Sequence, residues 1–370
     1  MRHFLFIWIF APALLLFSAD RLSANSTPEA ADGRVVGRPV PVVEYSLRSP
    51  GVTFLLQDPV VGSSLQGPVD ASSLHGSGAR VAGGMHLPFD NSRMDTVDGV
   101  AIHYRHWEQP EGERKGSCLL LHGFGASTFS WQEVADSLHQ LGYEVVAVDI
   151  PPFGFSDKSA RINQSVTAHA LRLKQLTTGV LPGRKWHLAG HSMGGRVAQA
   201  FSIQYPEHLH SVTFVSAAIF STLEVESRPA RTLLRLSPLR FLLGELAEEW
   251  VITPRRLEDM LQSAYGTPPD EDQVEAYLHP LRIPGTARAI LAAATFHEEL
   301  TPLDAANLRV PAIAIWGDSD TWVPVERRER ALERLPDTEL ILLEGVGHNP
   351  METHFDEFMG AWIPFLEQFD

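Results

Sequence analysis

Cysteine and basic residues are both scarce in this chain. A single cysteine, Cys118, among 370 residues excludes any intramolecular disulfide bond. The 30 lysines and arginines are outnumbered by 45 aspartates and glutamates, which gives a formal net charge of −15. Such acidity argues against nucleic-acid binding and mainly favours solubility. The apolar run at residues 4–17 is also shorter than the ~20 residues that a membrane-spanning helix requires.

Residues 1–24 instead have the pattern of a secretory signal. A basic start at residues 1–3 precedes the apolar run, and residues 18–19 or 22–24 offer small side chains for cleavage. Neither site is a clean match to the small-x-small pattern. We therefore expect either a signal peptide or an uncleaved segment that tethers the protein to a membrane. In both cases the sequence predicts an exported protein, periplasmic or secreted.

Residues 25–90 are rich in glycine, proline and serine, and we interpret them as an N-terminal extension without a core of its own. Beyond it, Asp98-Gly99 separates two strand-like runs, which is a strong hairpin signal. Further strand-like runs alternate with helical patterns, near residues 117–121, 144–149, 186–190, 212–216, 311–316 and 338–343. The alternation predicts an α/β domain over residues 91–370, with a mostly parallel sheet and helices on both faces.

A helical stretch at about residues 219–305 interrupts this alternation. Thr253 and Pro254 form a good N-cap and first turn for one helix, and Asp270 opens another. The apolar residues 233–243 could line an acyl pocket or simply pack the stretch onto the sheet, because ligand pockets are largely apolar as well.

The most informative motif is Gly190-His191-Ser192-Met193-Gly194, a G-x-S-x-G pattern. An apolar strand-like run precedes it and a helical pattern follows, so we expect a strand, a sharp turn that presents Ser192, and a helix. Glycines flank the serine because a β-carbon there would clash with the neighbouring strand or helix. The Met193 N–H would then lie at the positive end of a helix, where it can stabilise an oxyanion.

A serine nucleophile needs a base to take its proton and a carboxylate to orient that base. His348 and Asp320 each follow a strand-like run downstream, in the order Ser, Asp, His. Because the carboxyl ends of parallel strands share one edge of a sheet, the three side chains can meet there. Asp318 competes with Asp320 for the acid role, but we interpret it as a turn residue.

Taken together, these motifs make the chain similar to the α/β-hydrolase fold family over residues 95–370. His122-Gly123-Phe124-Gly125 after a strand matches the family's oxyanion loop, and residues 149–157 resemble its D-x-P-G-x-G-x-S loop, with Pro152 in place of glycine. The resemblance implies that the Phe124 N–H is the second oxyanion donor. It favours Asp320 as the acid, and it implies a helical cap over the serine at about residues 219–305.

The predicted function is that of a serine hydrolase, an esterase or small lipase that cleaves a small-molecule carboxylic ester with an apolar acyl group. We expect an acyl-enzyme intermediate and no metal or organic cofactor. One alternative keeps the same side chains but cleaves a carbon–carbon bond in a vinylogous 1,5-diketone, as meta-cleavage-product hydrolases do. A second alternative is a non-catalytic binding protein on a hydrolase scaffold. The sequence leaves the acyl chain length and the oligomeric state open.

Overall fold

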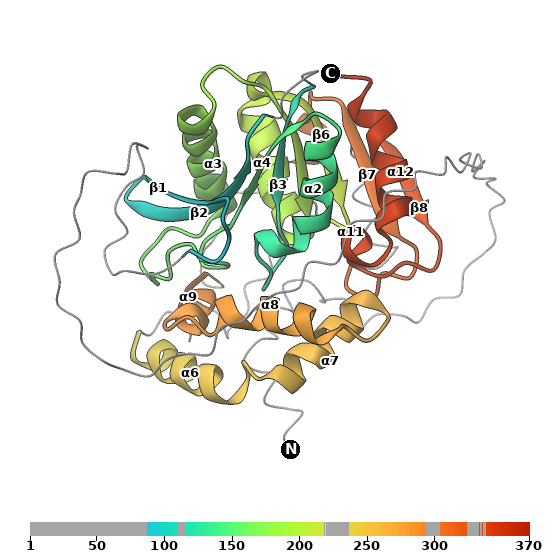
Figure 1. Cartoon of the computed structure of the whole chain (residues 1–370). Helices are drawn as coiled ribbons and strands as arrows, with labels where there is room; N and C mark the ends of the chain where they lie inside the picture. The colour runs from blue at the N-terminus through green and yellow to red at the C-terminus, as the bar shows by residue number, and fades with distance from the viewer. Residues whose placement is uncertain are drawn as a thin grey trace.

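A computed structural model describes residues 87–109, 115–217, 219, 237–293, 304–323, 333, 335 and 338–370. Within them an eight-stranded sheet runs in the order β1-β2-β4-β3-β5-β6-β7-β8 (Figure 1). β2 pairs antiparallel with β1 and with β4, and the other neighbouring strands pair in parallel. The predicted signal or anchor at residues 1–24 and almost all of the extension at 25–90 lie outside the described residues.

The sheet confirms the strands that the sequence predicts, with ends displaced by a few residues. The strands are β1 Ser92–Val97, β2 Val100–Trp107, β3 Ser117–Leu121, β4 Glu144–Val148, β5 Trp186–His191, β6 Leu209–Val215, β7 Ala312–Gly317 and β8 Glu339–Leu343. The hairpin between β1 and β2 turns at Asp98 and Gly99, whose φ angles of 52° and 72° belong to the left-handed region that such turns require.

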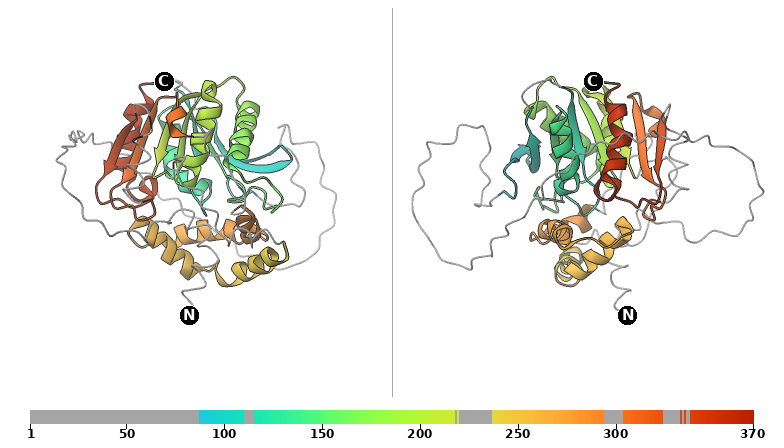
Figure 2. Two further views of the ribbon diagram at one scale, coloured as in Figure 1. Left: turned by 180° about the vertical axis from the view of Figure 1, so that it is seen from behind. Right: turned by 45° about the vertical axis from the view of Figure 1, so that its right-hand side comes forward.

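The central strands are apolar throughout because helices bury both of their faces. In β3, Leu119 and Leu121 pack on one side of the sheet, whereas Cys118 and Leu120 pack on the other, as the two-residue period of a strand dictates. α3 (Val166–Val180) and α4 (Met193–Gln204) cover the first side. α2 (Gln132–Gln140) and α12 (Phe355–Leu366) cover the second side (Figure 2). The expected α/β-hydrolase fold is therefore confirmed.

A separate helical layer lies beyond the carboxyl ends of the strands (Figure 1). Its elements are α6 (Ser237–Trp250), α7 (Pro254–Tyr265), α8 (Glu271–Leu281) and α9 (Thr286–Ala293). Thr253 and Pro254 begin α7 as the sequence predicts. The Asp270 side chain accepts a hydrogen bond from Gln273 N, and Gln273 returns one to the Asp270 backbone, which makes a capping box at the start of α8. The rest of the stretch at 219–305 lies mostly outside the described residues.

Apolar side chains hold this layer together in a cluster of its own, which includes Leu257, Leu261, Tyr265, Tyr277 and Leu278. The cluster also includes Ala126 from the loop after β3, so the layer packs directly onto the loops at the sheet edge. In the described part of the chain, no helix is both long and apolar enough to cross a bilayer.

Candidate active site

Ser192 occupies the sharp turn between β5 and α4 that the sequence predicts. Its backbone has φ 48° and ψ −112°, a conformation that non-glycine residues rarely adopt and that stores strain. The turn needs its glycines, because a β-carbon on Gly190 would lie 2.6 Å from the Gly194 carbonyl oxygen. A β-carbon on Gly194 would lie 2.5 Å from the Leu121 carbonyl oxygen. The glycines thus let β3, β5 and α4 approach closely enough to present the serine at the sheet edge.

His348 and Asp320 come together although 28 residues separate them. The Nδ1 atom of His348 lies 2.8 Å from Oδ2 of Asp320, and both side chains are buried. The other carboxylate oxygen of Asp320 accepts hydrogen bonds from the backbone N–H groups of Trp322 (2.8 Å) and Val323 (3.0 Å). These bonds hold the carboxylate in one orientation, so it can fix the tautomer of the imidazole.

Asp318 is exposed and makes a different set of contacts. Its Oδ1 accepts hydrogen bonds from the Gly345 backbone N–H at 2.8 Å and from the Ser319 hydroxyl at 2.9 Å. The side chain therefore stabilises the loops after β7 and β8 and does not contact His348. This arrangement agrees with its interpretation as a turn residue.

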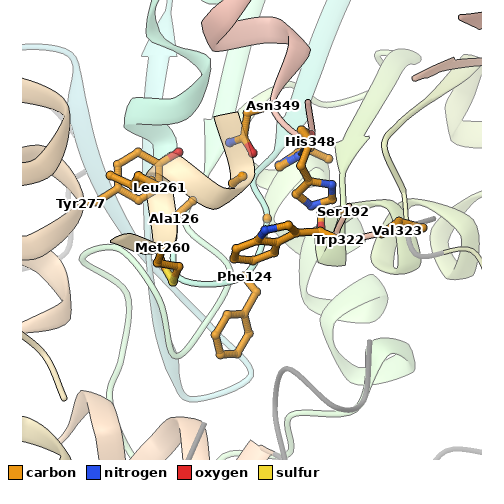
Figure 3. Close-up of a pocket in the computed structure, with 13 residues that line it drawn as sticks. Phe124, Ala126, Ser192, Met260, Leu261, Tyr277, Trp322, Val323, His348 and Asn349 are labelled. Atoms are coloured by element: carbon orange, nitrogen blue, oxygen red, sulfur yellow. Dashed lines mark hydrogen bonds between the residues drawn. The ribbon is translucent and has the colours of Figure 1, made fainter. Parts of the chain in front are cut away.

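Ser192 and His348 line the same pocket, which encloses about 530 Å³ of empty space when its solvent-open part is included. Figure 3 shows Trp322 beside them and Met260, Leu261 and Tyr277 farther across the pocket. Across the described residues, no hydrogen bond joins the Ser192 hydroxyl to His348. Catalytic hydrogen bonds are often long in unliganded enzymes and tighten when substrate binds.

The apolar wall of this pocket comes from α7 and α8, through side chains that include Met260, Leu261 and Tyr277. The sequence left open whether residues 233–243 line an acyl pocket or pack the helical stretch onto the sheet. Phe241 and Leu242 on α6 are 52% and 56% exposed and do not line the pocket. An apolar run shows which helix has apolar residues but not which helix faces the serine.

Two further side chains support His348, and the sequence did not assign them this place. The Trp322 ring stacks on the His348 ring, with 5.4 Å between centroids and 19° between planes. His191 Nε2–H donates to the His348 carbonyl oxygen at 2.9 Å and so links the serine turn to the histidine loop. Burial, reinforced by the neighbouring His348, lowers the pKa of His191 well below its usual range. The close spacing of Trp322 to Asp320 was the available signal for its location.

The two predicted oxyanion donors come from different segments, the start of α4 and the loop after β3. Met193 is the first residue of α4, and Phe124 lies in the pocket lining after β3. Beneath this loop, His122 is buried and its Nδ1–H donates to the Gly123 carbonyl oxygen at 2.7 Å. Burial lowers the pKa of His122, which suits a neutral structural histidine. The role of Phe124 and Met193 as donors stays a prediction.

A buried carboxylate anchors the loops around the predicted oxyanion site. Asp149 accepts hydrogen bonds from the backbone N–H groups of Thr128 and Phe155 and contacts His103 Nδ1 at 2.7 Å. Burial would raise the pKa of Asp149, but His103 holds it below its usual range. Among the described residues, no group of three or more histidine, cysteine, aspartate or glutamate side chains is arranged to bind a metal ion.

The alpha/beta hydrolase fold family matches this chain over residues 118–355. The chain belongs to that family. This α/β-hydrolase shares 28% identity with Lipase 3 of Moraxella sp. (strain TA144), over 63% of the chain and 71% of the lipase. It shares 24% identity with a 2-hydroxy-6-oxononadienedioate/2-hydroxy-6-oxononatrienedioate hydrolase of Paraburkholderia phymatum, over 73% of the chain and 92% of that enzyme.

The fold of this α/β-hydrolase also resembles a solved structure that is described as a membrane phospholipase A. The two chains share 25% identity with a TM-score of 0.59, over 75% of this chain and 86% of the phospholipase. Family membership and these relatives identify the protein as an enzyme, a hydrolase of the α/β fold. A non-catalytic binding protein on the same scaffold is not what they indicate.

Proposed function

We propose that this hydrolase cleaves carboxylic esters with apolar acyl groups, with Ser192 as nucleophile, His348 as general base and Asp320 as the orienting acid. The observation that carries the proposal is the 2.8 Å contact between His348 and Asp320 at the rim of the pocket that also contains Ser192. This is the arrangement that activates a serine hydroxyl at neutral pH.

The mechanism follows from the atoms at this rim. Asp320 accepts the Nδ1–H of His348, which leaves Nε2 as the basic atom that removes the Ser192 proton. Ser192 Oγ then attacks the ester carbonyl, and the N–H groups of Met193 and Phe124 stabilise the oxyanion, each contributing about 3 kcal/mol to barrier lowering. His348 protonates the leaving alcohol, and it next activates the water that hydrolyses the acyl-enzyme.

The choice of an ester rests on the lining of the pocket and on the relatives. The walls of the pocket are predominantly apolar, which suits an acyl chain. The protein also resembles a lipase and a phospholipase A. The second candidate is hydrolysis of a carbon–carbon bond, which the resemblance to the Paraburkholderia enzyme favours. p-Nitrophenyl esters of graded chain length separate the two, because a strict carbon–carbon hydrolase is nearly inactive on all of them.

Labelling with a fluorophosphonate tests the nucleophile directly. The wild type should be modified stoichiometrically at Ser192, and Ser192→Ala should neither be labelled nor cleave esters. Ser202→Ala is a matched control, because Ser202 is buried in α4 with its hydroxyl bonded to the Ala198 carbonyl. Equal labelling of wild type and Ser192→Ala would place the nucleophile elsewhere and refute the proposal.

We also propose that the protein is exported, on the pattern of residues 1–24. Cell fractionation of the full chain beside a variant that lacks residues 1–24 tests this. Recovery of the full chain in the periplasm, medium or membrane supports export, and its retention in the cytoplasm contradicts it. Alkaline carbonate extraction of the membrane fraction then distinguishes a tethered from a released protein.

A further inference from the structure

A partly buried carboxyl group joins the loop of His348 to the helical layer. Glu352 lies in the short helix α11 (Pro350–Thr353), four residues after the histidine. Its Oε1 accepts a hydrogen bond from the Tyr265 hydroxyl at 3.1 Å. The Tyr277 hydroxyl contacts Oε1 at 3.0 Å and Oε2 at 2.8 Å, and Asn349 Nδ2 donates to Oε2 at 2.6 Å. One carboxyl group therefore gathers donors from α7, α8 and the histidine loop.

Helix α7 also contacts His348 through its backbone. The His348 N–H donates to the Ala264 carbonyl oxygen at 2.7 Å, which satisfies a carbonyl that the end of α7 leaves without a helical partner. Gly347 permits this approach, because a β-carbon on it would lie 2.5 Å from the same oxygen. The last turn of α7 is thus pressed against the residue that precedes His348.

Two of the residues that contact Glu352 also line the pocket, and we call this set of contacts between Glu352, Tyr265, Tyr277 and Asn349 the junction. Tyr277 and Asn349 line the pocket beside His348, whereas Glu352 lies behind them and does not line it. Any displacement of the carboxyl group therefore moves one wall of the pocket and the adjacent histidine together. A shift of about 1 Å in such a site can cost on the order of 10²-fold in rate.

We propose that Glu352 is a positioning residue, which through Asn349, Tyr265 and Tyr277 sets the place of His348 relative to the helical wall of the pocket. The inference rests on the proposed function, because it assigns Glu352 to the same serine hydrolase site. It adds a group that touches neither substrate nor Ser192 but decides how well the histidine is oriented.

The ionisation state of Glu352 gives the proposal a measurable signature. The groups that face the carboxyl are Tyr265 of α7, Tyr277 of α8 and Asn349 of its own loop, and none of them is a cation. Burial raises the pKa of Glu352 to about 7, although hydrogen bonds from Asn349 and Tyr277 act in the opposite direction. Burial also raises the pKa of both tyrosines, so they remain hydrogen-bond donors.

The ionised carboxylate can accept from all three donors at once, whereas the protonated form must use one oxygen as a donor. Ionisation therefore orders the junction while its buried charge costs stability. As the pH rises through neutrality, wild type should gain reactivity relative to Glu352→Gln and lose stability relative to it. A merely structural role for Glu352 would make reactivity and stability change in the same direction.

The experiment measures the rate constant for fluorophosphonate labelling of Ser192 against pH, in wild type and Glu352→Gln. If both His348 and Glu352 must lose a proton, the wild-type logarithmic profile has a limiting slope of about 2 on its acid side, and the variant has a slope of about 1. We expect the variant to lose roughly 10-fold in its plateau rate. Urea midpoints at each pH supply the stability comparison.

Glu357→Gln is the matched control, because Glu357 is an exposed glutamate in the first turn of α12 and its removal changes the net charge equally. Its profile should coincide with wild type. If Glu352→Gln does not fold, Tyr277→Phe replaces it: Glu352 still titrates there but loses a donor to its carboxylate, so the acid side of the profile should move to higher pH. Superimposable profiles of wild type and the Glu352 variant would overturn this inference alone, whereas an unlabelled wild type would overturn the proposed function as well.

Discussion

Asp320 contacts His348 at 2.8 Å, while Asp318, two residues earlier, accepts a hydrogen bond from the Gly345 backbone instead. The two carboxylates follow the same strand, but one points into the pocket rim and the other toward solvent. Both residues lie in the turn after β7, where the chain changes direction and the Asp320 N–H donates to the Gly317 carbonyl oxygen, so the two side chains have different surroundings.

Asp320→Asn should therefore lower kcat by about 10³- to 10⁴-fold, because an amide at this place favours the wrong imidazole tautomer. Asp318→Asn, which keeps an acceptor for the Gly345 N–H, should stay within about 3-fold of wild type. Steady-state kinetics on a p-nitrophenyl ester compares them. A larger loss of kcat in Asp318→Asn than in Asp320→Asn would assign the acid role to Asp318 instead.

Gly347→Ala should destabilise the protein by about 1–3 kcal/mol and reduce activity, because the new methyl group would meet the Ala264 carbonyl oxygen. Gly360→Ala in α12 is the control, since a β-carbon there meets nothing within 4 Å. That change should be neutral or stabilise by up to about 1 kcal/mol. Urea denaturation measures both, and equal midpoints for the two variants would contradict the close contact.

The pH dependence of stability follows from the raised pKa of Glu352. Its pKa is about 7 in the folded protein against an ordinary value of 4.5, so the folded state retains the proton over this interval. The stability that Glu352 contributes is fully present below pH 4.5 and is lost as the pH rises through 7. Over that window the free energy of unfolding of wild type should fall by up to about 3 kcal/mol relative to Glu352→Gln.

Paired urea titrations at several pH values check this linkage, with Glu357→Gln as the control that retains Glu352 and should therefore follow wild type at every pH. A difference between wild type and Glu352→Gln that stays constant from pH 4.5 to 7 would show that the carboxyl group titrates normally.

Met260→Trp should shorten the acyl chains that the enzyme accepts. Met260 is partly exposed in the pocket lining and packs against the apolar cluster of the helical layer, so a larger side chain there occupies substrate space. Each methylene excluded from an apolar pocket costs roughly 10-fold or more, so kcat/KM for decanoate esters should fall far more than for acetate. Leu242→Trp, on an exposed part of α6, should leave chain-length preference unchanged. A uniform loss across all chain lengths would contradict a role in acyl binding.

Much of this enzyme could be predicted from the sequence because its signals are local. The glycines around Ser192, the cap residue Asp270 and the alternation of strands all act within a few residues, through sterics and hydrogen bonds to the nearby backbone. The sequence also showed that Ser192, Asp320 and His348 each follow a strand, here β5, β7 and β8, and parallel strands end at one edge of the sheet.

The wall of the pocket and the environment of His348 were not readable in the same way. Which helix of the layer faces Ser192 depends on how α7 and α8 pack over the sheet, and apolar residues occur on α6 as well. The gathering of Tyr265 and Tyr277 around Glu352 joins residues up to 87 positions apart. No local propensity encodes such a contact.

The sequence by itself thus determined the elements and their order, and it supplied the prediction of Ser192, Asp320 and His348 as reactive side chains, because backbone sterics and periodicity act over short distances. Only the tertiary structure decided which carboxylate meets His348, which helices enclose the serine and how Glu352 joins them. Those outcomes depend on how separate elements pack in three dimensions, and packing depends on the shapes of surfaces that are distant in the chain.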